Sequence, residues 1–491
     1  MASKDFKICL IQPGMYSFIK GVGKQFRPEP LASIPLLYLG AVLQKEGFTN
    51  IKIINCIADK DMHTARDREF IRTTIPAPKL AKKIKDFNPD VIGITCMYSQ
   101  NLPEAVSVAR IAKKVLPNVP VILGGVHITG QPIETLKQYN CFDIGVIGEG
   151  EKTIVELIKH ISSKRDSEAL KNINGICFRQ DNEIILTPPR DFISDLDTIP
   201  FPAYELADLK NFPNMYMLTS RGCPYQCTFC ASQLNSGKKW RAHSVDYLIE
   251  HIKLLIHKYN IKHIPFLDDN FALNLERVSN LTDRIIEEKL DFQWDVLMRA
   301  ERVSKELLLK MKKAGCQHIT IGAESGDQEF LNKVMKKNLH LEDVVRFAEL
   351  CEEIDMPLTV LFMVGMPGEN EQTRKKTIEF QRLLWKKNCV RAVTPSIATP
   401  FVGTKLYEIC KEKGYFEHDP TPEELAKTFL GLSGSLIKTK NFTPDDTIRF
   451  AIRSHLIQFS NPGKLLRKVF THRSKAILRL FSIIGSLNNV K

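Results

Sequence analysis

Three cysteines lie within ten residues of the sequence, in the stretch RGCPYQCTFC that ends at Cys230. Thiolates are ligands of zinc and of iron–sulfur clusters, and both kinds of site usually close with four protein ligands. Cys223, Cys227 and Cys230 offer only three. On a four-iron cluster, three thiolates leave one iron free to bind a small molecule. Zinc is the alternative, but the nearest histidine, His243, lies thirteen residues further on, which is a poor spacing for a zinc loop.

The whole chain has the composition of a soluble globular protein. Its 491 residues exceed one ordinary domain, and 43% of them are hydrophobic. The other nine of its twelve cysteines are scattered through apolar runs, which is typical of reduced, buried thiols. We see no signal peptide and no apolar run of membrane-spanning length. We therefore expect a cytoplasmic protein of two or three domains.

The first third of the sequence alternates apolar strands with amphipathic helices. Five such strands predict a doubly wound, flavodoxin-like or Rossmann-like parallel sheet in a domain over residues 1–165. Ligands of these sheets lie beyond the carboxyl ends of the strands. Here those ends carry Gly124, Gly125 and His127, and further along the chain Gly148, Glu149 and Gly150.

A second series of strands and helices follows a polar, Pro-rich stretch. We interpret residues 166–214 as a linker or small insert. Six apolar strands between 215 and 400, with helical runs between them, predict a partial (β/α)6 TIM-like barrel whose active residues follow the strands. Residues 401–491 are predicted to form a helical C-terminal region. The fold class is therefore α/β in both main domains.

The segment CPYQCTFC resembles the C-x3-C-x-aromatic-C motif of the radical S-adenosylmethionine superfamily. That resemblance implies a [4Fe-4S] cluster on Cys223, Cys227 and Cys230 whose open iron binds S-adenosylmethionine. It further implies reductive cleavage of S-adenosylmethionine to methionine and a 5′-deoxyadenosyl radical. The reductant would be a protein such as flavodoxin or ferredoxin.

Later segments resemble the same superfamily, in order and at strand ends. DDNF (268–271), MRAERV (298–303), IGAESG (321–326) and FMVGMPGE (362–369) match its later strand ends. TPFVGTKLYE (399–408) departs from the common pattern, because Phe401 and Val402 replace Pro-Gly. The resemblance implies that S-adenosylmethionine contacts Phe229, Asp268, Asp269, Arg299, Glu324 and Gly365.

The N-terminal domain resembles the cobalamin (B12)-binding domain fused to many of these enzymes. The resemblance rests on VILGGVHITGQP (121–132), GVIGEGEKT (145–153) and residues 30–47. It implies that Gly124, Gly125, His127, Gly148, Glu149 and Gly150 contact cobalamin. His63 lies in a partial D-x-H-x-x-G pattern, but Arg66 replaces the glycine, so we interpret that match as accidental. For His127, a hydrogen-bonded loop histidine is the alternative.

The leading functional hypothesis is a cobalamin-dependent radical methyltransferase acting on an unactivated carbon of a small molecule. A radical cyclase or rearrangement enzyme, similar to the anaerobic magnesium-protoporphyrin ester cyclase, would share these motifs. A tRNA methylthiotransferase would need further cluster cysteines in its N-terminal domain. A non-enzymatic cobalamin or cluster sensor would not need the row of strand-end residues.

The C-terminal tail carries much of the positive charge. Residues 447–491 contain nine Lys or Arg and no Asp or Glu, out of a net charge of +13. The pattern of 464–484 predicts a basic amphipathic helix. It could pack on the barrel, or contact an anionic membrane and deliver a lipid-like or natural-product substrate. We expect no nucleic-acid partner, because the tail has few aromatic residues and no binding module.

Overall fold

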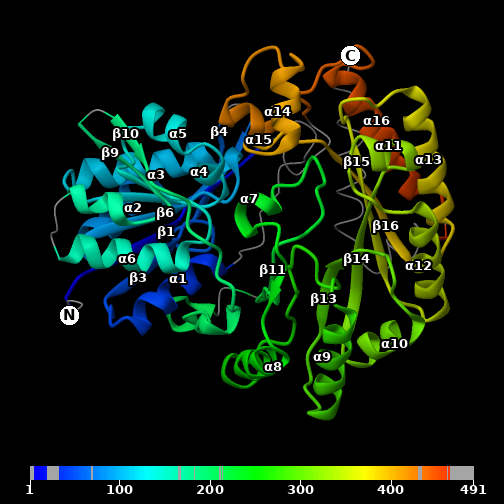
Figure 1. Cartoon of the computed structure of the whole chain (residues 1–491), viewed down its shortest axis with the longest axis horizontal. Helices are drawn as coiled ribbons and strands as arrows, with labels where there is room; N and C mark the ends of the chain where they lie inside the picture. The colour runs from blue at the N-terminus through cyan, green and yellow to red at the C-terminus, as the bar shows by residue number, and fades with distance from the viewer. Residues whose placement is uncertain are drawn as a thin grey trace.

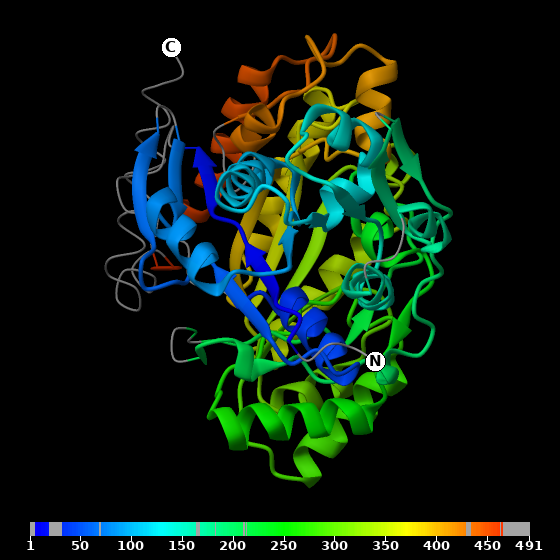
Figure 2. The same cartoon turned by 90° about the vertical axis from the view of Figure 1, so that its left-hand side faces the viewer.

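The computed structural model describes residues 5–18, 32–67, 70–163, 167–181, 183–209, 212, 214–428, 434–461 and 463–464. It has an N-terminal half and a barrel half that face each other, with C-terminal helices beside them (Figure 1). Seen from the side, the N-terminal half lies over the barrel sheet (Figure 2). The expected basic helix lies, from residue 465 onward, outside the described residues.

The N-terminal half is built on a seven-stranded sheet of order β10-β9-β8-β7-β6-β1-β3. Five neighbouring strands of this sheet, β3, β1, β6, β7 and β8, are parallel, as predicted from their apolar runs. The strands are β1 (Ile8–Gln12), β3 (Ile51–Asn55), β6 (Val91–Thr95), β7 (Val121–Gly124), β8 (Ile144–Val146), β9 (Ile176–Gln180) and β10 (Glu183–Leu186). The chain passes from β1 to β3 on one side of β1 and then crosses over to β6 on the other side, so the sheet has a switch point beside β1.

Helices cover both faces of this sheet. They are α1 (Ile34–Lys45), α2 (Ala77–Phe87), α3 (Leu102–Val115), α4 (Val126–Gly130), α5 (Pro132–Gln138) and α6 (Gly150–Ser162). Strands β2 (Met15–Phe18), β4 (His63–Asp67) and β5 (Phe70–Thr74) form a small separate sheet. The β9–β10 hairpin falls within the stretch expected as a linker or insert, and it extends the main sheet by antiparallel pairing.

The barrel half has six strand positions in the predicted order, but only four of them form a regular sheet. That sheet is β13 (Trp294–Met298), β14 (Cys316–Glu324), β15 (Leu358–Val364) and β16 (Val390–Ile397). Among the described residues, the first two positions pair only through isolated bridges: Met217 to Phe266, His263 to Gln293 and Phe266 to Val296. A short ladder of β11 (Ser220–Arg221) with β12 (Arg241–Ala242) follows the first position. The barrel is therefore partial, as expected.

The helices of the second half pack on the outer side of the barrel strands or follow them. They are α7 (Ser232–Ser236), α8 (Val245–Lys253), α9 (Leu275–Glu287), α10 (Lys305–Lys313), α11 (Gln328–Lys333), α12 (Leu341–Glu353), α13 (Glu371–Trp385), α14 (Lys405–Glu412), α15 (Pro422–Thr428) and α16 (Pro444–Leu456). Short 3-10 turns are Ser99–Asn101, Ser167–Asn172, Leu196–Thr198, Tyr204–Leu206 and Ile457–Phe459, and a π-helical turn spans Leu254–Lys258.

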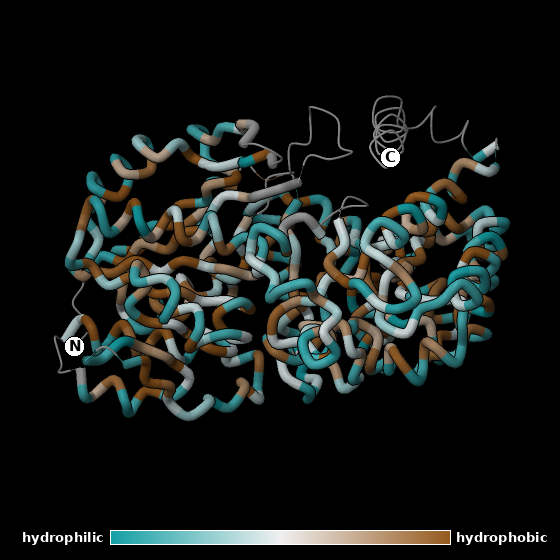
Figure 3. Tube along the Cα trace, turned by 90° about the horizontal axis from the view of Figure 1, so that it is seen from above, coloured by the Kyte–Doolittle hydropathy of each residue, from teal (hydrophilic) through white to brown (hydrophobic). Residues whose placement is uncertain are grey.

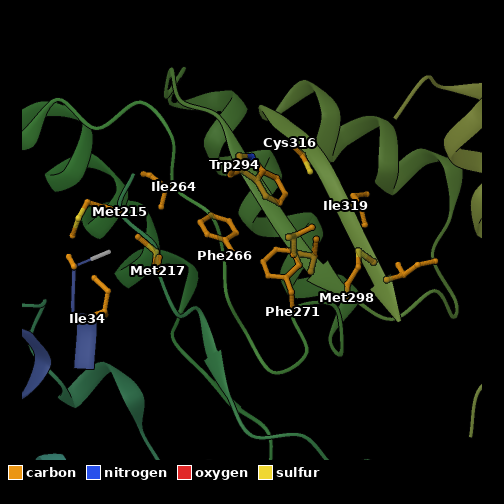
Figure 4. Packing of buried hydrophobic residues seen from close by; sticks show 14 of the residues in the cluster. Ile34, Met215, Met217, Ile264, Phe266, Phe271, Trp294, Met298, Cys316 and Ile319 are labelled. Carbon is orange, nitrogen blue, oxygen red and sulfur yellow. The ribbon is translucent and has the colours of Figure 1, made fainter. Parts of the chain in front are cut away.

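A hydrophobic core joins the two halves. One continuous cluster of buried side chains includes Ile34 of α1 together with Met217, Phe266 and Trp294 of the barrel. Figure 4 shows these residues side by side, and Figure 3 shows brown, hydrophobic stretches running through both halves. The two halves are therefore packed against each other directly. No helix among the described residues is long and apolar enough to cross a membrane.

Candidate active site between the two halves

The cysteine segment begins directly after β11, at the mouth of the barrel. Gly222 has a φ of +87°, and a Cβ atom there would lie 2.4 Å from the carbonyl oxygen of Lys239. Its amide donates a hydrogen bond of 2.8 Å to the Asp269 carboxylate. Only glycine fits this close turn. The sequence RGC therefore fixes the start of the loop.

The far end of the loop is held by backbone contacts to distant segments. The Thr228 amide donates to the Met335 carbonyl at 3.0 Å, and the Leu406 amide donates to the Thr228 carbonyl at 2.8 Å. Phe229, expected beside S-adenosylmethionine, is half-buried against the main core. Both ends of the cysteine loop are thus held by hydrogen bonds to segments distant in the sequence.

The three thiols lie at graded depth in this loop: Cys223 and Cys227 are half-buried, and Cys230 is exposed. Burial raises the pKa of the Cys223 and Cys227 thiols. Binding to iron would therefore release protons from them. No three His, Cys, Asp or Glu side chains in the described ranges gather as for one metal ion. The thiolates of a cubane each bind a different iron, so they need not converge on one point.

His243, the histidine considered as a zinc ligand, instead contacts Asp197 and Tyr247. Its Nδ1 lies 3.0 Å from an Asp197 carboxylate oxygen, and its ring stacks on Tyr247 with 3.9 Å between centroids. Burial lowers the pKa of His243 to about 4, although Asp197 opposes this shift. These contacts favour a structural role for His243.

Adjacent carboxylates Asp268 and Asp269 point in different directions. Asp268 is buried, and its two oxygens accept hydrogen bonds from the Thr219 amide and from the hydroxyls of Thr219 and Ser220. Burial raises the pKa of Asp268, although these hydrogen bonds oppose the shift. Asp268 therefore ties the second strand position to the first. Asp269 holds Gly222 and also lines the cavity between the two halves.

Arg299 follows β13 and is fixed by four partners. It forms a two-pronged ion pair with Glu301 at 2.6 Å and donates to the carbonyls of Lys337 and Asn338. Its guanidinium also lies 3.7 Å from the ring centroid of Tyr225, inside the cysteine segment. The contact brings a permanent positive charge to the cysteine segment.

Glu324 ends β14 and pairs with a lysine that the sequence did not single out. Its carboxylate lies 2.7 Å from the Lys337 ammonium, and both side chains are about nine-tenths buried. Glu324 has a φ of +64°, which is unfavourable for a residue with a side chain. Such strain is concentrated at functional sites. Lys337 lies in a loop far from any motif, so only the packing reveals it.

Gly365 follows β15 and is packed by the C-terminal region. Its φ is +83°, and an added Cβ atom would lie 2.5 Å from the Thr447 side chain of α16. Its amide donates a hydrogen bond of 3.0 Å to the buried Glu369 carboxylate, which also forms an ion pair with Arg374. The positive φ and the close approach of α16 therefore account for a glycine at position 365.

A cavity of about 530 Å³ lies between the carboxyl edge of the N-terminal sheet and the barrel mouth. Gly124, Gly148 and Gly150 line one side, and Cys230, Asp269 and Leu267 line the other. A Cβ atom added to Gly124 or Gly148 would meet no atom within 4 Å. These two glycines thus leave an open floor, against which a flat ligand can lie close to the backbone. Gly125 differs, because its Cβ would lie 2.5 Å from the Cys96 carbonyl oxygen.

His127 is buried behind this floor and does not line the cavity. Its Nδ1 lies 2.9 Å from the Ser99 hydroxyl, and its Nε2 lies 3.2 Å from the Thr135 hydroxyl. Burial lowers the pKa of His127 to about 4, so the ring is neutral near pH 7. This placement favours the alternative of a hydrogen-bonded loop histidine.

Glu149 joins the two halves. Its carboxylate accepts from Arg221 at 3.2 Å, from Arg241 at 2.9 Å and from the Ile193 amide at 2.8 Å. Glu151, at the start of α6, accepts from Arg221 at 2.7 Å. Burial would raise the pKa of Glu151, but the charge of Arg221 holds it below its ordinary value. Glu149 and Glu151 therefore clamp the arginine that precedes the cysteines; we call this group the acidic clamp.

Comparisons with known proteins match both halves separately. The Radical SAM superfamily model matches residues 217–380, and the B12 binding domain model matches residues 27–158. A solved structure of TsrM from Kitasatospora setae, with cobalamin and a [4Fe-4S] cluster bound, has the same fold, with a TM-score of 0.71 and 16% identity. That comparison covers 98% of this chain and 99% of TsrM.

Sequence relatives cover nearly the whole chain. An uncharacterized methyltransferase of Pyrococcus horikoshii is 31% identical over 97% of both chains. The cytidylyl-2-hydroxyethylphosphonate methyltransferase of Streptomyces wedmorensis is 25% identical over 85% of this chain and 83% of its own. The anaerobic magnesium-protoporphyrin IX monomethyl ester cyclase of Cereibacter sphaeroides is 26% identical over 83% of this chain and 64% of its own. The expected enzyme class and cofactors are thus confirmed, and the chain belongs to the radical S-adenosylmethionine enzymes that carry a B12-binding domain.

Proposed function

We propose that this enzyme transfers a methyl group to a carbon atom of a small-molecule substrate. The observation that carries the proposal is the single cavity that touches both the open glycine floor and Cys230. When bound, the cluster and S-adenosylmethionine supply a radical that removes hydrogen from the substrate, and the corrinoid supplies the methyl group. Because one cavity faces both sites, a substrate held there can reach both groups.

We assign the chain's residues to these groups as follows. Cys223, Cys227 and Cys230 would hold the cluster. Asp269, Arg299 and Glu324, with Phe229, Asp268 and Gly365 behind them, would shape the S-adenosylmethionine site. Gly124, Gly125, Gly148 and Gly150 would let the corrinoid approach the backbone, while Glu149 and His127 would support that edge from behind.

The wider setting is also part of the proposal. We propose a cobalamin domain at 1–165, a barrel at 215–400 and a C-terminal region at 401–491, with residues 166–214 between the first two. A cytoplasmic location is supported by the absence of a disulfide at all twelve cysteines, and a flavodoxin or ferredoxin would supply electrons. The basic tail would give peripheral contact with an anionic membrane.

The number of S-adenosylmethionine molecules used per product separates methyl transfer from cyclisation. One molecule would methylate the corrinoid, leaving S-adenosylhomocysteine, and a second would give 5′-deoxyadenosine. The reconstituted enzyme, supplied with reductant, methyl-deuterated S-adenosylmethionine and a small-molecule extract, should form both by-products in equal amounts. A product should gain one deuterated methyl group. Substrate turnover with 5′-deoxyadenosine but without S-adenosylhomocysteine would instead support the cyclase alternative.

A further inference from the structure

The strands of the barrel have one fully packed side and one side that is only partly covered. In β13, Trp294, Val296 and Met298 are buried against the helices, and Figure 4 shows Trp294 and Met298 in that layer. Since successive side chains of a strand point to opposite faces, Leu297 points to the inside of the barrel. Leu297 nevertheless keeps 38% of its surface exposed. An exposed leucine inside a barrel requires an explanation.

Leu297 continues a row of leucines across the first three strand positions. The bridges from Met217 to Phe266 and from Phe266 to Val296 place the next residues, Leu218, Leu267 and Leu297, side by side. Leu267 is 49% exposed. Leu218 and Leu267 also line the cavity that reaches Cys230. Clustered exposed apolar side chains mark a ligand site far more often than single ones do.

The remaining strands carry hydroxyl groups on the same inner side of the barrel. Leu297 is in register with Thr320, which is in register with Thr359 on β15. On β16, Ala392 is in register with Thr359, and Thr394 lies two residues further along on the same side; all three threonines are partly exposed. We call Leu218, Leu267, Leu297, Thr320, Thr359 and Thr394 the inner face. Half of it is apolar, and the other half offers neutral hydrogen-bonding groups.

The charged groups that border the inner face are already paired. On the side of the strand ends, Glu324 pairs with Lys337 and Arg299 pairs with Glu301. On the opposite side, the Asp295 carboxylate lies 2.9 Å from Nε2 of His263. A phosphate or carboxylate bound on the inner face would therefore lose its hydration without gaining a free cation from these groups.

We propose that the inner face binds the hydrocarbon body of an uncharged substrate, with the threonines placed to meet a neutral polar group such as a hydroxyl. This inference rests on the proposed function in taking the bound molecule to be the one that is methylated. It narrows the substrate class to neutral molecules with a large apolar part, such as isoprenoid alcohols.

Equilibrium dialysis with tritiated farnesol tests this proposal on the holoenzyme, with cluster, corrinoid and S-adenosylmethionine bound and no reductant. Farnesol should bind saturably, at one molecule per chain, and at least tenfold more tightly than farnesyl diphosphate. Leu297→Lys should weaken farnesol binding at least tenfold, because the new charge would have no partner on the inner face. Leu309→Lys is the matched control, since Leu309 is 47% exposed on α10 outside the barrel, and it should leave binding unchanged.

Each other outcome overturns the proposal. Those outcomes are equal or tighter binding of the diphosphate, no saturable binding of farnesol, or a Leu297→Lys variant that binds as the parent does. Iron and corrinoid contents report whether a variant is folded, and Leu267→Lys replaces Leu297→Lys if that variant is not. Dialysis requires no turnover, so the two tests can fail separately. An enzyme that binds farnesol in dialysis but, in the turnover assay with reductant, forms 5′-deoxyadenosine and product without S-adenosylhomocysteine would refute methyl transfer and leave the assignment of the inner face as a binding site intact.

Discussion

The two sides of the cavity are built for different kinds of ligand. On the N-terminal side, Gly124 and Gly148 leave open space and present uncharged backbone. On the barrel side, Arg299 and Glu324 lie at strand ends outside the cavity lining, and each already forms an ion pair inside the protein. The first side selects a ligand by shape. The second can bind a charged ligand only by exchanging an existing ion pair for a new one.

The backbone follows the same division. Among the cavity-lining residues of the N-terminal side, positive φ angles fall on Gly125 and Gly148, for which they cost little. On the barrel side, an unfavourable angle falls on the buried Glu324, which costs about 1–3 kcal/mol. The buried pair with Lys337 holds this conformation in place.

The largest change should follow removal of one thiol on the barrel side. Cys227→Ala should abolish the cluster and the formation of 5′-deoxyadenosine, because two thiolates cannot hold the cubane. Corrinoid binding should remain, since the glycine floor is untouched. Iron analysis, corrinoid absorption and 5′-deoxyadenosine assays measure the three quantities. Cys56→Ala, which removes a buried thiol of the N-terminal half, should keep all three. If Cys227→Ala loses the corrinoid as well, the two sides are not independent.

A moderate loss of stability should follow from breaking the buried ion pair. Lys337→Met would leave the Glu324 carboxylate buried without its partner, and the free energy of unfolding should fall by about 3 kcal/mol. Adding Glu324→Gln should restore part of it. Urea unfolding of the cofactor-free protein measures this, with Lys333→Ala as the control. Lys333 pairs with Glu329 on the surface, so its loss should change the free energy of unfolding far less than Lys337→Met does. If Lys337→Met and Lys333→Ala lowered the free energy of unfolding equally, the Glu324–Lys337 pair would not be a buried ion pair that stabilises the fold.

The smallest change should follow from filling the glycine floor. Gly124→Val adds two methyl groups beyond Cβ to open space, and corrinoid affinity should fall about tenfold, which is ~1.4 kcal/mol. Gly124→Ala should have a smaller effect, and the iron content should stay unchanged in both variants. Titration of the cofactor-free protein with hydroxocobalamin measures the affinity. An unchanged affinity in Gly124→Val would show that the corrinoid does not approach this glycine.

The sequence predicted those features that depend on local pattern. The cysteine spacing, the apolar strands and the glycines after β7 and β8 are each written within a few neighbouring residues. The partners of these residues are not. Lys337 meets Glu324, and Arg241 meets Glu149, only because segments distant in sequence pack together. The sequence alone therefore could not show that the Asp268 carboxylate is hydrogen-bonded to Thr219 and Ser220, whereas Asp269 lines the cavity.

The extent of the barrel strands could not be predicted either. The apolar runs at 215–220 and 263–269 read as full strands, but in the structure they pair only through single bridges. The buried carboxylate of Asp268 ties them together in place of a regular ladder. A polar network of this kind has no periodic pattern in the sequence, so it leaves no trace in strand prediction.

The acidic clamp makes the two cofactor sites thermodynamically linked if the loop that carries it moves. Residues 148–151 contain Gly148 of the glycine floor and also the two carboxylates that hold Arg221, which leads into Gly222 and Cys223. Should corrinoid binding shift this loop by even a small amount, the cluster segment would shift with it. Reciprocity then requires that each cofactor change the affinity for the other by the same factor, whichever is loaded first. The order in which the protein is loaded would alter the route but not the final state.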